Sequence, residues 1–289
     1  MIVVLLGPTG SGKSDLALSL AEALDAAIIN GDAFQVYRDL SIATNKPSQD
    51  ILAKVPHFLY DFVPLDSSYS VAEYQQDARC VIDFLQNQGK NIIIEGGTGL
   101  YVKAALYDYS FVEETPRDPS AYEGKSDEEL YEELKALDPV SGEKIHPNNR
   151  QRIIRALQIA SSSGKKKSEI EAEQNHAPLY PATFIAVDVD REGLYERVDE
   201  RVEEMFARGL LEETLPLIER YGRDASAFKA IGVKELFPYI DGEITLEEAK
   251  RLIKLNTRHY VKRQLTWLRH QFQLTWVKNL KDALEAIKA

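Results

Sequence analysis

The chain has 289 residues, of which 44% are hydrophobic, so it can form one large domain or two modest ones with a buried core. Its net charge of −11 would ordinarily argue against a nucleic-acid partner, because binding to phosphate backbones depends on positive charge. A single cysteine excludes an internal disulfide, and without a targeting pattern or an apolar run of roughly 20 residues the expectation is a cytoplasmic protein.

The first third of the chain alternates between apolar strands and amphipathic helices. An apolar run at 2–6 leads into a glycine-rich turn and a helix that begins at Lys13. Further strands are expected at 26–30 and 91–95, with a helix at 71–88 between them, in which Cys80 is expected to be a small core residue. Buried strands separated by helices predict an α/β fold with a parallel sheet flanked by helices on both faces.

From residue 112 to about 176 the sequence shows no strand pattern. A capping box at 126–129 begins one helix, and a second helix is expected from 149 to about 162. A last strand follows at 183–189, and a long helix capped at 245–248 reaches about residue 270. We therefore predict a first part of the core at 1–112, a small all-helical insertion domain at 113–176, and a second part of the core at 177–289.

The most specific local feature is a phosphate-binding loop between the first strand and the first helix. The pattern G-x-x-x-x-G-K-[ST] is matched by Gly7, Pro8, Thr9, Gly10, Ser11, Gly12, Lys13 and Ser14. In such a loop the backbone N–H groups converge on phosphate oxygens, and the helix N-terminus adds partial positive charge. Lys13 is expected to neutralise phosphate, and Ser14 to ligate Mg²⁺. The loop predicts a P-loop NTPase-like enzyme, with ATP as the default ligand.

Two acidic residues, Asp32 and Glu95, follow predicted strands at the edge where open α/β sheets bind ligands. Either could hold Mg²⁺, as in other P-loop enzymes, and a solvated turn carboxylate is the simpler alternative for each. On these residues alone the leading interpretation is a small-molecule or nucleoside kinase with Asp32 as its base. A non-catalytic RNA-binding protein is disfavoured because Lys13, Ser14 and Asp32 are all present.

Blocks spread over nearly the whole chain carry a more specific signal. They are NGDAFQVY at 30–37, IATNKP at 42–47, VPH at 55–57, GGTGLY at 96–101, HPNNRQR at 146–152, AIGVKE at 230–235 and TRHYVKRQLTW at 257–267. In content and order these blocks resemble the tRNA dimethylallyltransferases of bacterial type. The resemblance implies transfer of a dimethylallyl group from dimethylallyl diphosphate to N6 of the adenosine 3′ to the anticodon, with the tRNA anticodon stem-loop as acceptor.

The resemblance also implies roles for single residues. Lys13 would bind the diphosphate leaving group, and Asp32 would accept the proton of the attacking amine. Thr98 would line the channel between donor and acceptor, with capping of the following helix as the alternative. Phe34 and Gln35 would receive the target base beside Asp32, although Phe34 could equally be an ordinary core residue.

Two basic regions then become candidates for binding tRNA phosphates. They lie at 144–168 and 250–281, and neither contains an Asp or Glu. In the second region a basic residue recurs every four positions, at Lys250, Lys254, Arg258 and Lys262. Such a stripe is usually a solvated face of a helix. Beside the basic residues of the first region, a surface that clamps tRNA phosphates is the better interpretation. The expected tRNA contacts are Asp32, Ala33, Phe34, Gln35, Thr98, Asn149, Arg150, Gln151, Arg152, Arg155, Lys234, Arg258, Lys262 and Arg263.

Departures from the family pattern bear on these contacts. Ala33 stands where a serine commonly follows the catalytic aspartate, and Val233 replaces a frequent tyrosine. Arg258 and Arg263 are alternatively candidates for the diphosphate.

Overall fold

The computed structural model describes residues 1–111 and 119–288, which form two compact units. One comprises Met1–Leu106 and Tyr180–Ala289, and the other comprises Tyr107–Leu179. The inserted unit thus begins earlier and ends later than the predicted 113–176. The reason is that its two connecting segments are paired: the Asp108 amide donates to the Ala177 carbonyl (2.8 Å), and the Tyr109 ring stacks on His176 at 4.0 Å.

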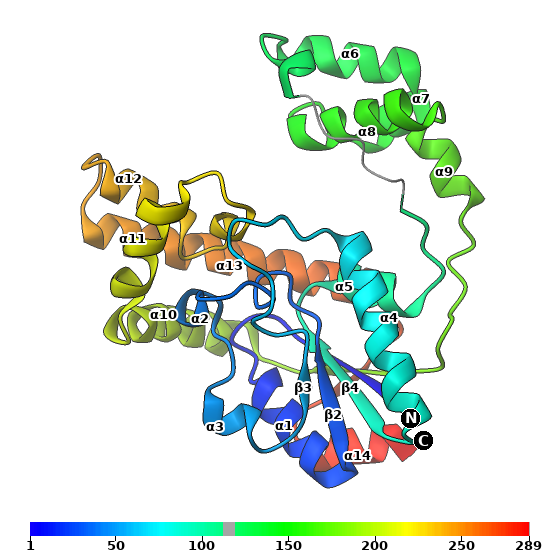
Figure 1. The fold of residues 1–289 in the computed structure, drawn as a ribbon, viewed down its shortest axis with the longest axis vertical. Coiled ribbons are helices and arrows are strands. Elements are labelled where there is room, and N and C mark those ends of the chain that lie inside the picture. Colours follow the sequence, from blue (N-terminus) through cyan, green and yellow to red (C-terminus); the bar gives the residue numbers. More distant parts are fainter. Residues whose placement is uncertain (112–118, 289) are drawn as a thin grey trace. The chain divides into compact units, whose positions relative to one another are not determined.

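The larger unit is built on a sheet of six parallel strands, as the alternating pattern predicted (Figure 1). Their order in the sheet is β3 (His57–Phe58), β2 (Ala26–Asn30), β4 (Asn91–Gly96), β1 (Ile2–Leu6), β5 (Thr183–Val187) and β6 (Thr275–Val277). Leu6 pairs with Gly96, and Asn30 pairs with Glu95. The carboxyl ends of β1, β2 and β4 therefore meet at one edge of the sheet, where the predicted site residues follow.

Helices cover both faces of this sheet (Figure 1). One face carries α1 (Lys13–Leu24) and α14 (Leu280–Lys288), whose Leu20 and Ala283 are buried among strand residues. The other carries α4 (Val71–Asn87) and α5 (Gly99–Leu106). None of the helices in the described residues is long and apolar enough to cross a membrane.

The prediction that Cys80 is a core residue is wrong. Cys80 is exposed on α4, whose buried residues are Tyr74, Ala78, Ile82 and Leu85. These four positions follow the helical repeat and define one face, and Cys80 lies off that face. Cysteine is often buried, but the helical repeat of α4 determines which positions face the core, and position 80 is not one of them.

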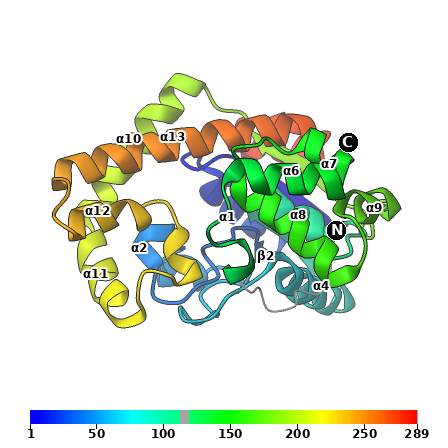
Figure 2. The ribbon, with the colours of Figure 1, turned by 90° about the horizontal axis from the view of Figure 1, so that it is seen from above.

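A second group of helices lies beyond the carboxyl edge of the sheet. It comprises α2 (Ser41–Thr44), α10 (Arg191–Ala207), α11 (Leu210–Tyr221), α12 (Phe237–Ile240), α13 (Leu246–Gln271) and 3-10 turns at Ser226–Lys229 and Lys234–Leu236. The short helix α3 (Gln49–Leu52) is not part of this group and lies on the segment that leads into β3. The capping box predicted at 245–248 begins α13, which runs beside α10 (Figure 2).

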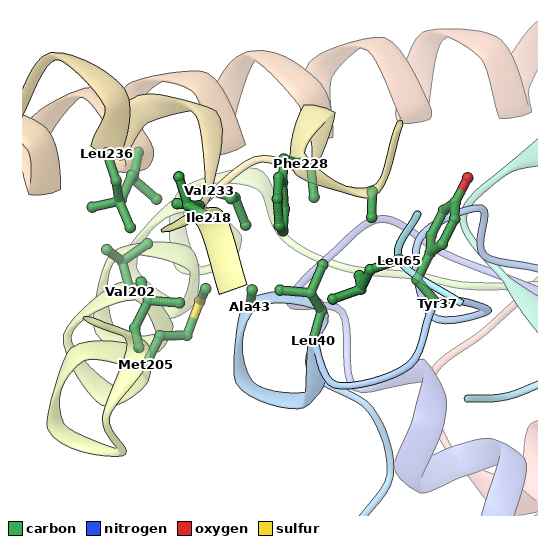
Figure 3. Packing of buried hydrophobic residues seen from close by; sticks show 14 of the residues in the cluster. Tyr37, Leu40, Ala43, Leu65, Val202, Met205, Ile218, Phe228, Val233 and Leu236 are labelled. Carbon is green, nitrogen blue, oxygen red and sulfur yellow. The ribbon is translucent and has the colours of Figure 1, made fainter. Parts of the chain in front are cut away.

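A hydrophobic cluster joins these helices to the loop that follows β2 (Figure 3). Leu40 of this loop and Leu65 of the segment after β3 pack with Val202 of α10 and with Phe228 and Val233 between α11 and α13. Val233, which replaces a frequent tyrosine of the family, is fully buried here. The cluster fixes the loop after β2, and with it the segment that carries Asp32, against α10 and α13.

The inserted unit is helical, as predicted, but has more helices than the two that the sequence indicated. It contains a 3-10 turn at Pro119–Tyr122, α6 (Asp127–Leu137), α7 (Pro139–Lys144), α8 (Arg150–Ser163) and α9 (Lys167–Glu173). Ser126 and Glu129 form the expected capping box of α6. The core of the inserted unit includes Leu130, Leu134, Ile153 and Leu157. The additional helices are short, and for this reason a periodic pattern did not reveal them.

Asp138 joins three helices of this unit and should make its stability depend on pH. The carboxylate accepts hydrogen bonds from the amides and hydroxyls of Ser141 and Ser168. Burial of Asp138 opposes ionisation, but these hydrogen bonds outweigh it and lower the pKa of Asp138 from 3.8 to about 2. The ionised Asp138 should therefore add on the order of 2 kcal/mol to the free energy of unfolding of this unit. This contribution should be fully present above pH 4 and be lost as the pH falls toward 2.

The comparison of Asp138→Asn with wild type in calorimetric unfolding checks this prediction. The difference in stability should be largest near neutral pH and vanish near pH 2, whereas Glu128→Gln, an exposed change in the same unit, should show little difference at either pH. A difference for Asp138→Asn that does not change with pH would contradict it.

Candidate active site

The phosphate-binding loop has the geometry that its sequence requires. β1 ends at Leu6, and α1 begins at Lys13 after Gly10 (φ 81°) and Gly12 (φ 79°), both in the left-handed region that favours glycine. The first N–H groups of α1 have no acceptor within the helix and are available to an anion. The Ser11 hydroxyl is buried and has no hydrogen-bond partner among the described residues.

Two amides of the loop are used within the protein. The Thr9 amide donates to Gln264 Oε1 at 3.0 Å, and the Ser11 amide donates to the Pro8 carbonyl at 3.2 Å. Of the predicted phosphate ligands, these two contribute no free backbone donor in this conformation. The donors offered to a phosphate are then the other amides of the loop and those at the start of α1, together with the Lys13 ammonium.

Glu95 lies at the centre of a polar cluster behind the loop. Its side chain accepts hydrogen bonds from Ser14 Oγ (3.0 Å) and the Tyr60 hydroxyl (3.0 Å), and lies 3.5 Å from Lys13 Nζ. Glu95 is 4% exposed, and burial together with the Glu95 charge raises the pKa of Tyr60, which remains a neutral donor. Of the two predicted acidic residues, Glu95 is therefore the one beside Ser14.

Asp32 is held in a tight loop that follows β2. The buried Asn30 side chain accepts from the Asp32 amide (2.9 Å) and donates to the carbonyls of Asp32 (3.1 Å) and Leu59 (2.9 Å). Asp32 Oδ1 in turn accepts from the Phe34 amide at 2.9 Å. This Asx turn fixes the direction of the carboxylate before any substrate is bound.

Thr98 joins the turn after β4 to the Asp32 loop. Its amide donates to the Gly31 carbonyl (3.2 Å), and its hydroxyl accepts from the Ala33 amide (3.2 Å). Tyr260 of α13 lies near the Thr98 hydroxyl. These contacts favour a place in the site over the alternative role of Thr98 as the cap of α5.

A hollow of about 230 Å³ opens beside these loops. Its polar groups include Asp32, Thr9 and Tyr260, and its apolar wall includes Phe34, Ala43, Val198, Val202, Met205, Ile231 and Ile253. Phe34 thus takes both expected positions, because it lines the hollow and also packs against the hydrophobic cluster. Burial and then the Asp32 charge raise the pKa of Tyr260, so its phenol is neutral.

A second hollow of about 370 Å³ lies over the phosphate-binding loop, and Arg201 of α10 lines both. The second hollow is formed by residues 10–15 together with Asn45, Arg197, Glu200, Arg201 and Glu204. Burial lowers the pKa of Arg201, an effect that the nearby Asp32 charge opposes, and the guanidinium stays protonated. Arg201 therefore presents a positive charge between the phosphate-binding loop and Asp32.

Sequence reasoning missed Arg201, although a signal was present. Arg201 lies three residues after Val198 and four before Met205, on the face of α10 that buries its apolar residues. A charged residue on an otherwise apolar helical face indicates either a partner or a ligand. No motif marks the position, so only the periodicity could have revealed it.

Some of the predicted tRNA contacts in the larger unit line a hollow or a groove, and one is held by hydrogen bonds within the protein. Lys234 and Arg263 line the first hollow. Gln35 donates its side-chain amide to the carbonyls of Thr44 (3.1 Å) and Asn45 (3.0 Å), which limits its freedom to receive a base. Arg263 also lines an exposed groove on α13, together with His259, Lys262, Thr266, Trp267, His270 and Gln271.

The predicted contacts in the inserted unit divide between structural and exposed positions. Asn149 caps α8, and Arg150 binds Asp127 at 2.8 Å and the carbonyls of Lys125 and Tyr122. Gln151 and Arg152 are exposed, and Arg155 is half-buried. Arg150 thus has a clear structural role within its own unit.

Three of the four cations in the α13 stripe form ion pairs with carboxylates of another helix. Lys250 and Lys254 bind Glu203 at 3.3 Å and 2.6 Å, and Arg258 binds Asp199. These carboxylates belong to α10, so the sequence of α13 alone could not reveal them. Lys262 has no ion pair in the part of the chain that the structure describes.

A parallel sheet, a phosphate-binding loop after its first strand and a carboxylate at the end of the adjacent strand define a P-loop α/β protein. The family model described as IPP transferase matches residues 35–271, and the chain belongs to this family. The resemblance noted in the sequence is thereby confirmed.

Named relatives match almost the full length. A tRNA dimethylallyltransferase of Anoxybacillus flavithermus is 44% identical over 98% of this chain and 92% of its own length. A tRNA dimethylallyltransferase of Bacillus subtilis is 43% identical over 95% of this chain and 90% of its own length. Solved structures agree. A tRNA delta(2)-isopentenylpyrophosphate transferase from Staphylococcus epidermidis has a TM-score of 0.73 at 34% identity, covering 99% of this chain and 97% of that one. A eukaryotic dimethylallyltransferase acting on tRNA has a TM-score of 0.82 at 29% identity, covering 97% and 74%.

Proposed function

We propose that this protein is a tRNA dimethylallyltransferase. It transfers the dimethylallyl group of dimethylallyl diphosphate to N6 of the adenosine immediately 3′ of the anticodon and releases diphosphate. The observation that carries the proposal is the hollow beside Asp32, whose wall combines apolar side chains (Phe34, Val198, Val202 and Met205) with cationic ones (Arg201, Lys234 and Arg263). The apolar side chains can receive a five-carbon group, and the cations can contact its diphosphate or a tRNA phosphate.

The diphosphate would occupy the hollow over the phosphate-binding loop. Lys13 and the first amides of α1 border this space, and Arg201 closes it toward Asp32. Cations and N–H donors stabilise the negative charge that develops on diphosphate as the allylic C–O bond breaks. The loop then binds a leaving group rather than a phosphate that is to be transferred.

Asp32 would act on the acceptor side of the same hollow. The adenine N6 is a weak nucleophile, because its lone pair is delocalised into the ring. As the bond from N6 to the allylic carbon forms, the bond from that carbon to diphosphate oxygen breaks and one N6 proton passes to Asp32. The target base must leave the anticodon-loop stack to reach this carboxylate, and Phe34 offers an apolar surface to receive it.

Ser14 and Glu95 fit a Mg²⁺ site. Ser14 Oγ and Glu95 Oε1 lie 3.0 Å apart, and Mg²⁺ is commonly bound by one or two such protein oxygens together with substrate phosphates and water. A bound Mg²⁺ would supply further positive charge to the diphosphate. Glu95 is in addition fixed by Tyr60 and Lys13, so the oxygen donors of the site are already oriented.

The experiment that tests the proposal compares two donors with the same protein. The protein is incubated with unmodified tRNA and Mg²⁺, once with dimethylallyl diphosphate labelled in its carbon chain and once with ATP labelled in its γ-phosphate. We expect carbon label in the tRNA and no transfer of phosphate to tRNA or to nucleosides. Phosphate transfer without prenyl transfer would identify a kinase and overturn the proposal.

Mutation of the basic residues on α13 should lower tRNA affinity at positions that offer their charge to tRNA and change it little at a position already paired with a carboxylate. Lys262→Ala and Arg263→Ala are each expected to weaken tRNA binding and to reduce the slope of log K against log salt by about 0.7 to 1. Lys254→Met should change tRNA affinity little, because its ammonium is paired with Glu203. Affinities measured over a series of salt concentrations check this, and an equal effect of all three changes would contradict it.

A further inference from the structure

Gln264 connects the phosphate-binding loop to the turn that carries Thr98. Its Oε1 accepts a hydrogen bond from the Thr9 amide (3.0 Å), and its Nε2 donates to the Gly97 carbonyl (3.1 Å). Gln264 is 5% exposed, so both bonds form away from water. If the amide were lost, a buried donor and a buried acceptor would remain without partners.

The turn after β4 is shaped to fit α13. A Cβ on Gly97 would lie 2.2 Å from Gln264 Nε2, and a Cβ on Gly99 would lie 1.5 Å from the Trp267 ring. A side chain at Gly99 would therefore force the turn away from the helix, and one at Gly97 would displace the Gln264 amide. Because Thr98 lies between these two glycines, contact with α13 determines where its hydroxyl points.

Tyr260, one helical turn before Gln264, extends the same contact toward Asp32. The Tyr260 hydroxyl lies near the side chains of Thr98 and Gln264, and the Thr98 hydroxyl accepts from the Ala33 amide at 3.2 Å. One face of α13 thus holds the phosphate-binding loop, the Thr98 turn and the Asp32 loop in a single network.

We infer that Gln264 is a positioning residue that sets the distance between the two halves of the site. It holds the loop that would bind diphosphate on one side and the turn beside Asp32 on the other. Transfer requires the leaving group, the allylic carbon and the amine to be aligned, and a misplacement of about 1 Å can lower the rate roughly 10²-fold. The inference rests on the proposed function.

Gln264→Met tests it, because methionine keeps the length of the side chain and removes both hydrogen bonds. The single-turnover rate of dimethylallyl transfer should fall by about 10²-fold. The Kd for inorganic diphosphate should stay near the wild-type value, because the phosphate-binding groups are retained. Leu268→Ala, four residues further along α13 and 2% exposed, is the matched control; it should lower the melting temperature but leave the rate near wild type.

Gln264→Glu gives a readout that a loss of stability would not produce. An ionised carboxylate repels the Gly97 carbonyl, whereas a protonated one donates to that carbonyl and still accepts from the Thr9 amide. The rate of this variant relative to wild type should therefore rise as the pH falls from about 8 to about 6.

The outcomes separate the two claims. A wild-type protein that transfers the group, with a Gln264→Met variant that keeps the full rate or loses rate and diphosphate affinity equally, would overturn the positioning role alone. A wild-type protein that transfers no dimethylallyl group would overturn the proposed function and this inference with it.

Discussion

Asp32→Asn should lower the rate of dimethylallyl transfer by about 10² to 10⁴-fold, the usual contribution of a general base. The asparagine oxygen can still accept the hydrogen bond that the Phe34 amide makes with Asp32 Oδ1 at 2.9 Å, so the loop should keep its shape. What is lost is the group that takes the N6 proton. Single-turnover rates with saturating tRNA and dimethylallyl diphosphate measure the effect.

The control for Asp32→Asn is a second aspartate in the same segment. Asp39 is exposed and has a φ of 64°, a conformation that asparagine also tolerates, so Asp39→Asn should leave the rate near wild type. The Kd for inorganic diphosphate should be similar in both variants. If Asp32→Asn transferred the dimethylallyl group at close to the wild-type rate, the assignment of Asp32 as base would be wrong.

Arg201→Ala is expected to have the second largest effect, a fall in rate of about 10² to 10³-fold, as for the loss of one donor to a developing anion. Arg201 is the side chain that lines both the hollow over the phosphate-binding loop and the hollow beside Asp32. It can therefore contact the diphosphate at the end from which the allylic carbon departs. Arg201→Lys should retain part of the rate, because it keeps the charge but loses the planar fork of donors.

The matched control for Arg201 is Arg220→Lys, which changes an exposed arginine on α11 outside both hollows. Its rate and its diphosphate affinity should match wild type. Parallel measurements of rate and of the Kd for inorganic diphosphate should show both impaired in Arg201→Ala. An Arg201→Ala variant with wild-type values for both would show that the guanidinium does not contact the diphosphate.

The parts of the site that the sequence predicted are those that depend on local order along the chain. The phosphate-binding loop needs only a strand, two glycines with positive φ and a helix, all within residues 2–24. The sequence indicated Asp32 and Glu95 as alternative acidic residues at the carboxyl edge of the sheet, and the structure places Glu95 beside Ser14. Local rules of this kind predict the fold class and the phosphate-binding half of the site.

The parts of the site that the sequence could not predict depend on contacts between elements that are far apart along the chain. Arg201 reaches the site only because α10 packs beside α13, and the partners of Lys254 and Arg258 lie on α10, more than 50 residues away. The strands β3 and β6 have 2 and 3 residues, too few for a periodic pattern. Gln264 stood in a recognised block, but its two hydrogen-bond partners became visible only in the folded chain.

The measurement that tests the central claim most directly is nucleoside analysis of the product tRNA. Unmodified tRNA is incubated with the protein, Mg²⁺ and dimethylallyl diphosphate, then digested, and the fragments are sequenced by mass spectrometry. We predict a gain of one C₅H₈ unit on the adenosine immediately 3′ of the anticodon, with release of one diphosphate for each group transferred. Release of diphosphate without a mass gain on tRNA, or a gain at another nucleotide, would contradict this account of the site.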